Sequence, residues 1–498
     1  MIKGSQDNIH PHAMKPANLL FIFSDEHDPR YMGCSGHPLV RTPNMDRLAA
    51  RGTRFTNAWT PCPICVPARA SLATGRHVHD VGCWDNAIAY DGRVPGWGQR
   101  LQSEGMRVES IGKLHYRNES DPTGFDRQQE PMHIHEGVGL LWGSVRDPMP
   151  EKAGRSPLFD QLGPGTSSYN RYDQRIADLA VAWLEERAAA PDAKPWMLFL
   201  GFVAPHMPLM VPQKYLDLYP LDRIELPKLL PRAGYRRHPW VERMAKHWDH
   251  DATLGTDERR KLAIACYFGL ITYLDEQIGR VVGALERTGL LESTRIIYTT
   301  DHGDNLGTRG LWNKCVMYRE STGIPLITAG PEIEKGKVCK TNASLVDIYP
   351  TVLAGMGLEP TPAERGLPGA SLFNLASSPD DPNRNGFSEY HAVGAATGAF
   401  MLTRGRFKYH YYVGFPAELF DLEADPEETR DLAGDPAFAG VVADLEAQLR
   451  AMLDPEAVDR RAKDDQNALV ARYGGPEAVR TMGNSGTTPP PLKFHDEK

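Results

Sequence analysis

The stretch "NLLFIFSDEH", residues 18–27, indicates the fold class of this chain. It opens with a continuous apolar run, "NLLFIF" (residues 18–23), and then changes abruptly to ionisable residues. A continuous apolar run of this length is typical of a parallel strand that is buried on both faces. Asp25, Glu26 and His27 follow directly, so we expect them at the carboxyl end of that strand.

Outward from this strand, helix-like and strand-like segments alternate along the chain. Residues 42–52 are typical of a helix with Thr42 as its cap, and residues 257–287 predict a long helix that leads into the strand "RIIYTT" (residues 295–300). This alternation predicts an α/β fold, a mostly parallel sheet with helices on both faces. We expect further strands at residues 107–112, 196–203 and 324–330, and further helices at residues 96–105, 172–190, 344–357 and 441–453.

The composition changes near residues 358–386, where Pro, Gly, Ser, Asp and Asn dominate, and we place a linker there. The expected domains are a large one at residues 14–370 and a small α+β domain at residues 385–465, with a hairpin at residues 398–413. Residues 466–498 form a C-terminal extension whose end is rich in Pro, Gly, Ser and Thr. That end is either disordered or an arm that grips a second subunit, and we expect a homo-oligomer, a dimer or tetramer.

Composition and charge exclude several classes of protein. The chain has 498 residues, of which 41% are hydrophobic and 24% charged, as in ordinary soluble globular proteins. A net charge of −8 argues against a general nucleic-acid binder. The longest apolar run, residues 196–204, is far shorter than the roughly 20 residues that span a membrane. The N-terminus shows no apolar signal region, and seven scattered cysteines indicate a reduced, cytoplasmic protein.

Three further predicted strands also run directly into ionisable residues. Ligands of open α/β sheets bind just beyond the carboxyl ends of the strands, so we expect the four loops to converge on one site. A single residue of this kind is more often structural or a helix cap, but four such strand ends in one chain favour a shared site. The residues that follow the three strands are Lys113 and His115, then His206, then Asp301, His302, Asp304 and Asn305.

The pooled groups are carboxylates, imidazoles and cations, which together suit a reaction on an oxyanion ester. Ca²⁺, Mg²⁺ and Mn²⁺ prefer oxygen ligands, and an imidazole beside the carboxylates favours Mn²⁺. Surrounding cations offset the charge of a tetrahedral sulfate or phosphate in the transition state. The residues alone therefore predict metal-assisted hydrolysis of such an ester. The groups are Asp25, Asp301, His115, His206, His302, Lys113, Lys314 and Arg69.

A second stretch, "PICVPARASLATG" (residues 63–75), places Cys65 at the expected start of a helix. Pro67 suits a first helical turn, and good helix formers follow it. A helix N-terminus favours an anion, and we expect it to lower the pKa of the thiol. Cys62 lies three residues upstream, which raises the alternative of a redox pair. Pro63 disfavours a redox pair. A zinc site would need a second pair of ligands of similar spacing, and the sequence has none.

Cys65, Pro67 and Arg69 resemble the Cys-x-Pro-x-Arg signature of type I sulfatases. Other segments resemble sulfatases in the same order, among them "TPNMDRLAARGTRFTNAWT", "GKLHY", "APHMP", "TTDHGDNLGTRGLWNK" and "ELFDLEADPEETRDLA". The resemblance implies an alkaline-phosphatase-like fold, a mostly parallel sheet sandwiched by helices, with a smaller C-terminal α+β domain. In this family the signature cysteine is converted after translation to Cα-formylglycine, which implies a formylglycine-generating enzyme as a partner.

The resemblance also implies a role for each candidate residue. Cys65 would become an aldehyde hydrate, one hydroxyl of which attacks sulfur. The second hydroxyl, deprotonated by a base such as His115, would then release sulfate from the covalent intermediate. Arg69 would hold the hydrate, Lys113 and Lys314 would neutralise the sulfate oxygens, and His206 would bind the leaving oxygen and, with Lys314, protonate it.

The implied metal ligands are Asp25, Asp301 and His302, and the ion is Ca²⁺ or Mn²⁺ rather than Mg²⁺. Glu26 is a weaker candidate ligand, because many sulfatases carry a second aspartate at its position. His302 stands where many of them have asparagine. The Asp-His pair resembles choline sulfatases and phosphonate monoester hydrolases, as does "GCWDNAIAYDGRVPGW", in which Asn86 would touch the substrate.

We therefore expect hydrolysis of a small sulfate monoester, either an aryl or a small alkyl sulfate. One alternative keeps the site but makes phosphonate monoesters or phosphodiesters the main substrates. Another is a non-catalytic oxyanion-binding or thiol-redox protein built on Cys62 and Cys65. The run "RRHPWVERMAKHWDH", residues 236–250, is either an exposed insertion that packs its tryptophans or a wall that selects the substrate alcohol.

Overall fold

An eight-stranded sheet forms the centre of the molecule. Its strand order is β11-β2-β10-β9-β1-β7-β4-β5. The computed structural model describes residues 14–150, 158–480, 482, 488–491 and 494. The strands of the sheet are β1 (Asn18–Asp25), β2 (Gly52–Phe55), β4 (Arg107–Lys113), β5 (Arg127–Met132), β7 (Trp196–Pro205), β9 (Thr294–Thr300), β10 (Leu326–Ala329) and β11 (Lys337–Cys339).

The sheet is mostly parallel, as predicted. β1 lies at its centre and pairs in parallel with both β7 and β9. β4 continues the parallel arrangement from β7 to β5. β10 is antiparallel to β9 and to β2, and β11 is parallel to β2, so β10 alone runs against the other strands of this sheet.

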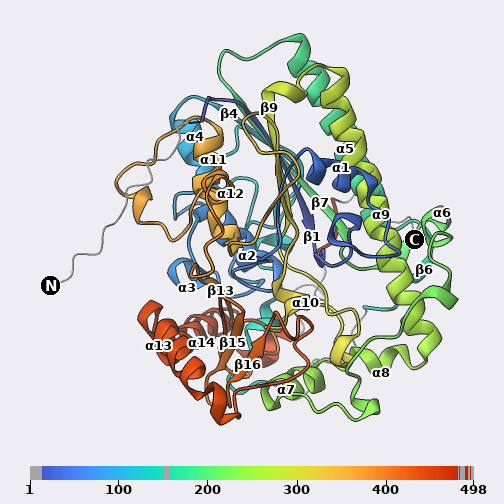
Figure 1. Cartoon of the computed structure of the whole chain (residues 1–498), viewed down its shortest axis with the longest axis vertical. Helices are drawn as coiled ribbons and strands as arrows, with labels where there is room; N and C mark the ends of the chain where they lie inside the picture. The colour runs from blue at the N-terminus through green and yellow to red at the C-terminus, as the bar shows by residue number, and fades with distance from the viewer. Residues whose placement is uncertain (1–13, 151–157, 481, 483–487, 492–493, 495–498) are drawn as a thin grey trace.

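The opening apolar run is buried on both faces of the sheet, as expected for β1. Leu20 and Ile22 join the core beneath one helical layer, whereas Leu19, Phe21 and Phe23 join the core beneath the other. Figure 1 shows the two layers on opposite sides of the sheet. The first layer holds α1 (Pro43–Ala50), α5 (Ser168–Ala189) and α9 (Asp257–Arg287), and the second holds α2 (Cys65–Thr74), α4 (Trp97–Ser103), α11 (Ile348–Gly355) and α12 (Leu372–Ser377).

Local signals explain where two of these helices begin. α9 starts where predicted, with the Thr256 hydroxyl accepting a hydrogen bond from the Arg259 N–H at 3.3 Å. Thr42 precedes α1 as predicted, but its side chain caps no N–H of that helix. Its hydroxyl instead donates to Asp46 Oδ1 at 2.9 Å. The first turn of α1 contains Pro43, which has no N–H to satisfy.

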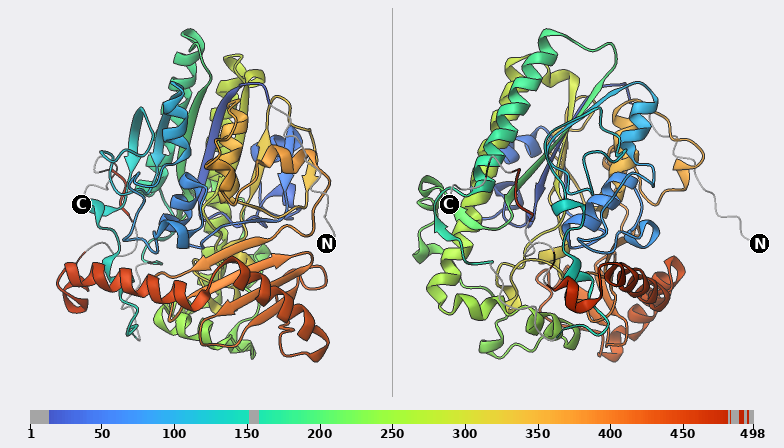
Figure 2. Two further views of the ribbon diagram at one scale, coloured as in Figure 1. Left: turned by 90° about the vertical axis from the view of Figure 1, so that its left-hand side faces the viewer. Right: turned by 180° about the vertical axis from the view of Figure 1, so that it is seen from behind.

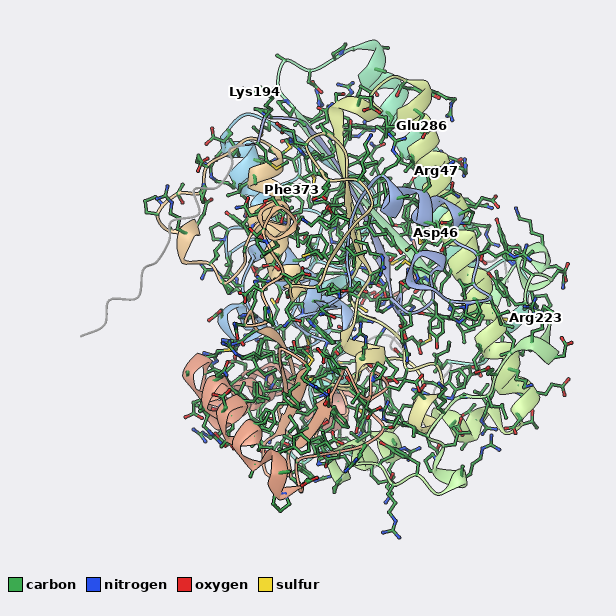
Figure 3. All side chains as sticks on the ribbon, viewed as in Figure 1. Asp46, Arg47, Lys194, Arg223, Glu286 and Phe373 are labelled. Atoms are coloured by element: carbon green, nitrogen blue, oxygen red, sulfur yellow. The ribbon has the colours of Figure 1, made fainter. Side chains whose placement is uncertain are left out.

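The carboxyl ends of the parallel strands face the C-terminal domain. Figure 3 labels Lys194, just before β7, at the end of the sheet far from that domain. Arg47 of α1 and Glu286 of α9 lie on one side of the sheet in the same view, and Phe373 of α12 lies on the other. Figure 2 shows the smaller domain below the parallel strands. The strand-end loops therefore lie between the two parts of the molecule.

The smaller C-terminal domain is α+β, as predicted. Its antiparallel sheet has the order β13-β14-β15-β16 and its core includes Trp59 and Ile64 of the larger part. Sequence analysis missed its second long helix, which begins after Asp454, whose side chain accepts a hydrogen bond from the Ala457 N–H at 3.0 Å. The elements are β13 (Gly386–Tyr390), β14 (Ala399–Arg404), β15 (Phe407–Tyr412), β16 (Glu418–Asp421), α13 (Ala439–Met452) and α14 (Pro455–Arg472).

Two sequence-based expectations concern the ends and surfaces of the chain. Across the described ranges, no helix has both the length and the apolar character that crossing a bilayer requires. Much of the expected C-terminal arm, including residues 483–487 and 495–498, lies outside the described residues. The domain boundaries and the homo-oligomer stay predictions.

Candidate active site

Cys65 is the first residue of α2, directly beyond the carboxyl ends of the parallel strands. Every residue of this helix is buried, and its N-cap residue, Ile64, offers no side-chain hydrogen bond to the first turn. The Cys65 Sγ lies 3.4 Å from His302 Nε2 and 3.8 Å from Asp25 Oδ1. Although Cys65 is 2% exposed, it lines a small cavity that the strand-end loops share.

The prediction of a lowered thiol pKa at Cys65 is wrong. Burial and the neighbouring charge of Asp25 raise the pKa of Cys65 to about 12, and they outweigh the attraction of Lys314. Burial also raises the pKa of Cys62 well above its ordinary value. All seven cysteines are free thiols. Because thiol-disulfide exchange needs a thiolate, these environments disfavour the redox alternative.

Arg69 lies one turn further along α2 and binds the two carboxylates below Cys65. Its Nη2 donates to Asp25 Oδ2 and its Nε donates to Asp301 Oδ2, both at 2.9 Å. Its Nη1 donates to the Lys113 carbonyl at 3.1 Å. Lys113 Nζ lies 2.6 Å from Asp25 Oδ2. The side chains of Arg69, Asp25, Asp301 and Lys113 are all almost completely buried, so the pairs hold each other in fixed positions.

His302 presents a lone pair to the same point. Its Nδ1 donates to the Gly303 carbonyl at 3.0 Å, because a carbonyl can only accept. Burial and the charge of Lys314 hold the pKa of His302 well below its ordinary value, so the ring is neutral. Its Nε2, 3.6 Å from Asp301 Oδ1, is then unprotonated. A backbone carbonyl that fixes the tautomer in this way is typical of histidine ligands of metals.

The donor set fits a divalent cation. One atom each from Asp25, Asp301, His302 and Cys65 lies within 4.8 Å of the others. Burial and the charge of Asp25 raise the pKa of Asp301 to about 6, despite the nearby Arg69. Burial alone would raise the pKa of Asp25 too, but the charges of Lys113, Arg69 and Lys314 hold it well below its ordinary value. A carboxylate with a raised pKa beside an ionised one marks a place where a positive charge would be stabilised.

Glu26 takes part in a second, adjoining group of ionisable side chains. Its Oε2 lies 3.0 Å from Lys314 Nζ and 3.4 Å from His206 Nε2. Burial raises the pKa of Glu26 well above its ordinary value, and the neighbouring carboxylates of Asp304 and Asp25 raise it further against the opposing charge of Lys314. One atom each from Glu26, Asp25 and His206 also lies within 4.8 Å of the others. Glu26 thus connects the carboxylates to the cations that line the cavity.

The strand-end loops carry several residues with left-handed backbone. The φ angle is 69° at Glu26, 59° at His115, 71° at Asn313 and 84° at Cys315. Asn313 and Cys315 flank Lys314, so both neighbours of this cation have this conformation. Each such residue that is not glycine costs about 1–3 kcal/mol, and these residues concentrate at functional sites.

The cavity brings together residues that follow β4, β7 and β9 with the start of α2, whereas the residues after β1 lie behind its lining. Its polar lining includes Cys65, Lys113, His115, His206 and Lys314. Asn86 also lines it, and Asn86 Oδ1 accepts a hydrogen bond from the Val66 N–H at 3.2 Å, at the first turn of α2. Most predicted site residues line this cavity, and the others lie just behind it. Arg69, Asp25, Glu26 and His302 contact a residue that lines it, and an Asp301 oxygen lies within 4.8 Å of the Cys65 Sγ.

Sequence reasoning did not identify Thr488 and left the role of Trp248 open. Thr488, which lines the cavity, comes from the C-terminal segment, for which the sequence allowed either disorder or an arm that grips a second subunit. No local signal marks it, because its contacts join residues more than 300 positions apart. Trp248 lies in the run 236–250, for which an exposed insertion and a wall were both open, and its side chain lines the cavity.

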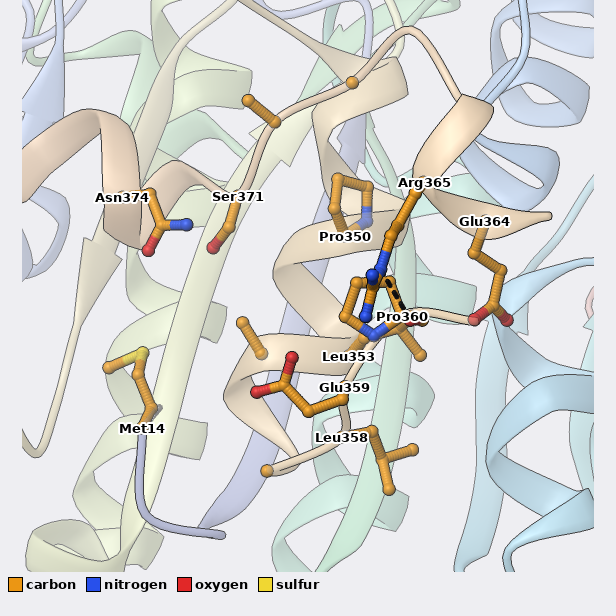
Figure 4. A pocket seen from close by; sticks show the side chains of 14 residues that line it. Met14, Pro350, Leu353, Leu358, Glu359, Pro360, Glu364, Arg365, Ser371 and Asn374 are labelled. Carbon is orange, nitrogen blue, oxygen red and sulfur yellow. Dashed lines mark hydrogen bonds between the residues drawn. The ribbon is translucent and has the colours of Figure 1, made fainter. Parts of the chain in front are cut away.

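A larger cavity, of about 220 Å³, lies away from the strand ends (Figure 4). It is lined by Met14, by α11 and by residues of the predicted linker. The Arg365 side chain extends toward Pro360 there, and its Nε donates to the Pro360 carbonyl at 3.2 Å. None of the predicted site residues lines it. The smaller cavity at the strand ends is therefore the candidate active site.

The fold and the site define an enzyme that acts on a tetrahedral oxyanion ester, and comparison with known proteins specifies the family. The model of the sulfatase family matches residues 17–358, and the model of the N-sulphoglucosamine sulphohydrolase C-terminal region matches residues 307–454. The choline-sulfatase of Rhizobium meliloti is 30% identical over 491 residues, covering 93% of this chain and 91% of that protein. Arylsulfatase K of Danio rerio is 28% identical over 466 residues, covering 89% and 85%.

Solved structures agree at the level of the fold. The phosphonate monoester hydrolase of Agrobacterium radiobacter superimposes with a TM-score of 0.71 at 23% identity, covering 87% of this chain and 95% of that chain. The chain belongs to the sulfatase family. It is accordingly a sulfuric ester hydrolase.

Proposed function

We propose that this enzyme hydrolyses sulfate monoesters with a nucleophile derived from Cys65 and with the help of one divalent cation. The observation that carries the proposal is the placement of Cys65. Its Sγ lies between the carboxylates and His302 on one side and a cavity lined by Lys113, Lys314 and His206 on the other. A nucleophile at this position lies next to the groups that would activate it, and it shares a cavity with the cationic groups that would bind an oxyanion.

Two groups would complete the site. Converted by a formylglycine-generating enzyme, residue 65 supplies an aldehyde hydrate as nucleophile, and Asp25, Asp301 and His302 would hold a divalent ion that supplies Lewis acidity. Two carboxylates with one imidazole suit Mn²⁺ or Ca²⁺ better than Mg²⁺. Glu26 is already engaged by Lys314 and His206, which leaves it the weakest candidate ligand. Arg69 keeps the carboxylates of Asp25 and Asp301 in place by binding both.

Lys113 and Lys314 approach the cavity from two different strand-end loops. Both are fixed at their inner side by a carboxylate, Asp25 and Glu26 respectively. Burial alone would lower the pKa of Lys314, but the surrounding anionic groups raise it well above its ordinary value, so it stays charged. The two ammonium groups would therefore neutralise sulfate oxygens in the transition state, where charge moves toward the leaving oxygen.

His206 and Lys314 are the candidates for protonating the leaving oxygen. The Nδ1 of His206 donates to the Met207 carbonyl at 2.7 Å. Burial and the charge of Lys314 hold the pKa of His206 well below its ordinary value, so Nε2 carries a lone pair. A bound anionic ester would favour protonation of Nε2 and so prepare it as an acid. Lys314 carries its proton in either state.

His115 is the candidate base. Burial and the charges of Lys113 and Arg69 hold the pKa of His115 well below its ordinary value, so the ring is neutral and able to accept a proton. It lines the same cavity as Cys65. In this position it would accept the proton of the second hydroxyl of the hydrate, the step that frees sulfate.

The outer wall of the cavity suggests an uncharged alcohol as the leaving group. Leu140, Met207, Trp248 and Val393 form much of this wall, and the Trp248 ring packs against that of Trp142 with centroids 5.9 Å apart. Among the described residues that line the cavity, none is Asp or Glu. A cationic alcohol such as choline would meet no carboxylate there and would depend on the ring of Trp248, so we propose an aryl or small alkyl sulfate as the substrate.

Parallel kinetics on matched esters would test this proposal. The converted, metal-loaded enzyme is assayed with an aryl sulfate, a small alkyl sulfate, choline sulfate, and the phosphonate and phosphodiester that carry the same aryl group. We expect the aryl or alkyl sulfate to have the highest kcat/KM. A phosphonate value far above the sulfate value would instead make this enzyme a phosphonate hydrolase with the same site.

A further inference from the structure

The C-terminal segment contributes a side chain to the active-site cavity. Thr488 lies in a part of the chain more than 370 residues beyond His115, yet its side chain lines the cavity. It is only 8% exposed. Its Oγ1 lies 2.7 Å from His115 Nε2, a short hydrogen bond.

Two contacts with the start of α5 hold this segment in place. The Tyr169 hydroxyl donates to the Thr488 carbonyl. Further along, the Phe494 ring packs against Tyr172 with centroids 5.2 Å apart, and Arg171 Nη2 donates to the Phe494 carbonyl at 3.3 Å. Figure 2 shows the dark red C-terminal segment against the larger part of the molecule, separate from the C-terminal domain. The described part of the segment is therefore held at the threonine itself and again at Phe494.

His115 has few other means of keeping its ring oriented. Within the described residues, its Nδ1 is buried and has no hydrogen-bond partner. Its backbone has a φ of 59°, a conformation that does not itself fix the side chain. An imidazole held by one hydrogen bond can turn about its side-chain bonds when that bond is removed. The Thr488 hydroxyl is thus the group that fixes the ring, and because Nε2 is engaged by this hydrogen bond, Nδ1 is the nitrogen left to accept a proton.

We propose that Thr488 is a positioning residue: its Oγ1 accepts the Nε2–H of His115, which fixes the tautomer and holds Nδ1 in the orientation needed to accept a proton. The inference rests on the proposed function, because it takes His115 as the base. It adds that the C-terminal segment of this chain completes the active site, a role distinct from packing or subunit contact. The substrate contacts of Lys113, Lys314 and His206 do not depend on the threonine.

Two substitutions separate the hydroxyl from the bulk of the residue. Thr488→Val keeps the shape but removes the hydrogen bond, and Thr488→Ser keeps the hydrogen bond. We expect Thr488→Val to lower kcat for an aryl sulfate by about tenfold to a hundredfold, as misplacement of a catalytic group does, with KM within about twofold. Thr488→Ser should stay within about threefold of the unsubstituted enzyme. Thermal unfolding should be the same for both variants, since neither alters a large apolar contact.

A second readout does not depend on turnover. Crystal structures of the unconverted proteins, with cysteine still at residue 65, should show the His115 ring in one orientation for the unsubstituted enzyme and Thr488→Ser. In Thr488→Val the ring should be rotated or present in two conformers. Unchanged kcat and an unchanged ring in Thr488→Val would overturn the inference, as would equal loss in both variants. Absence of sulfate ester hydrolysis by the unsubstituted, converted enzyme would instead overturn the proposed function.

Discussion

Two clusters of buried charge lie within the same molecule, and they differ in how their charges are balanced. The first is the strand-end site around Cys65. The second surrounds Glu389 of β13, which joins the C-terminal domain to α3 (Val78–Val81) of the larger part. Glu389 Oε1 accepts hydrogen bonds from the N–H of His79 at 2.9 Å and from its Nδ1 at 2.8 Å, and Oε2 accepts one from His391 at 3.1 Å.

The Glu389 cluster is balanced. Burial alone would raise the pKa of Glu389, but His79 and His391 hold it well below its ordinary value. At the strand ends, Asp301 and Asp304 both have a pKa raised to about 6, with burial as the largest cause. Glu389 lines neither of the two cavities described above. Burial and shifted pKa values alone thus do not identify a catalytic site. Buried carboxylates beside a cavity whose pKa stays raised despite a neighbouring cation, as at Asp301 beside Arg69, do identify one.

The largest expected effect comes from replacing Cys65, the nucleophile precursor that the strand-end site has and the Glu389 cluster lacks. Cys65→Ala should lower kcat/KM for an aryl sulfate by about four to six orders of magnitude, as loss of a nucleophile does. Cys62→Ala serves as the matched control, because Cys62 is buried nearby and has no assigned role. It should keep activity within about twofold. Equal losses in the two variants would favour a redox role for the pair.

Removing a cavity cation should have the next largest effect. Lys314→Ala removes a charge aimed at the sulfate and should lower kcat by about 10²–10³-fold, the usual loss for a group that stabilises transition-state charge. Lys408→Met is the control, because Lys408 is also buried and paired, with Glu428 at 2.6 Å, but lies in the C-terminal domain. It should reduce stability and leave kcat of the folded enzyme within about threefold.

The Glu389 cluster should respond in the opposite way, through stability. Glu389→Gln should lower the free energy of unfolding by about 3 kcal/mol near pH 6, as breaking a buried ion pair does, with little change in kcat. Because the pKa of Glu389 is lowered on folding, its contribution is present above the ordinary value of 4.5 and is lost as pH falls toward the folded pKa. The pKa of His79 is raised, so its contribution is lost as pH rises above 6.5. Urea unfolding of the unsubstituted protein and of Glu389→Gln from pH 3 to 9 checks this. The difference between their free energies of unfolding should be largest between pH 4.5 and pH 6.5.

Metal addition should stabilise the protein through the strand-end site and not through the Glu389 cluster, and this effect should be smaller than those above. Mn²⁺ or Ca²⁺ at about 100 times its Kd should stabilise the protein by about 2.7 kcal/mol, since it binds only the folded state. A chelator should reverse the rise in Tm. Asp301→Asn should abolish the rise, whereas Glu389→Gln should retain it. A metal-induced rise of the same size in Asp301→Asn would remove Asp301 from the ligand set.

The smallest effect concerns the apolar wall. Trp248→Ala should raise KM for an aryl sulfate about tenfold, because an apolar contact of this kind is worth roughly 1–3 kcal/mol. It should change KM for methyl sulfate less than about twofold, since a methyl group does not reach the wall. Equal changes for both esters would show that Trp248 supports the fold of the site rather than the leaving group.

The parts of the site that follow apolar strands could be predicted from sequence. β1 opens with a continuous apolar run and β9 has the apolar centre Ile296–Tyr298, and the ionisable residues that follow, from Asp25 and Asp301 on, mark the edge where ligands bind. The fold class followed from the same alternation. β5 was missed because "RQQEPM" lacks an apolar run, and β2 and β11 were missed because they are short and gain their stability from neighbours.

Features that depend on distant contacts could not be predicted. The helix start at Cys65 indicated a low thiol pKa, but burial and Asp25, which comes from another strand end, reverse the direction. Thr488 meets His115 only because α5 holds the C-terminal segment, and no spacing in the sequence encodes that contact. Local patterns thus locate the strand ends, whereas tertiary contacts determine the charge states and the last wall of the cavity.

The central claim is that residue 65 acts as formylglycine. A mass spectrum of the peptide that contains residues 63–75, taken on preparations of increasing specific activity, tests it most directly. We expect the fraction of peptide carrying the aldehyde at residue 65 to rise in proportion to activity, with Cys62 unmodified throughout. A fully active preparation in which residue 65 remains a thiol would contradict the mechanism.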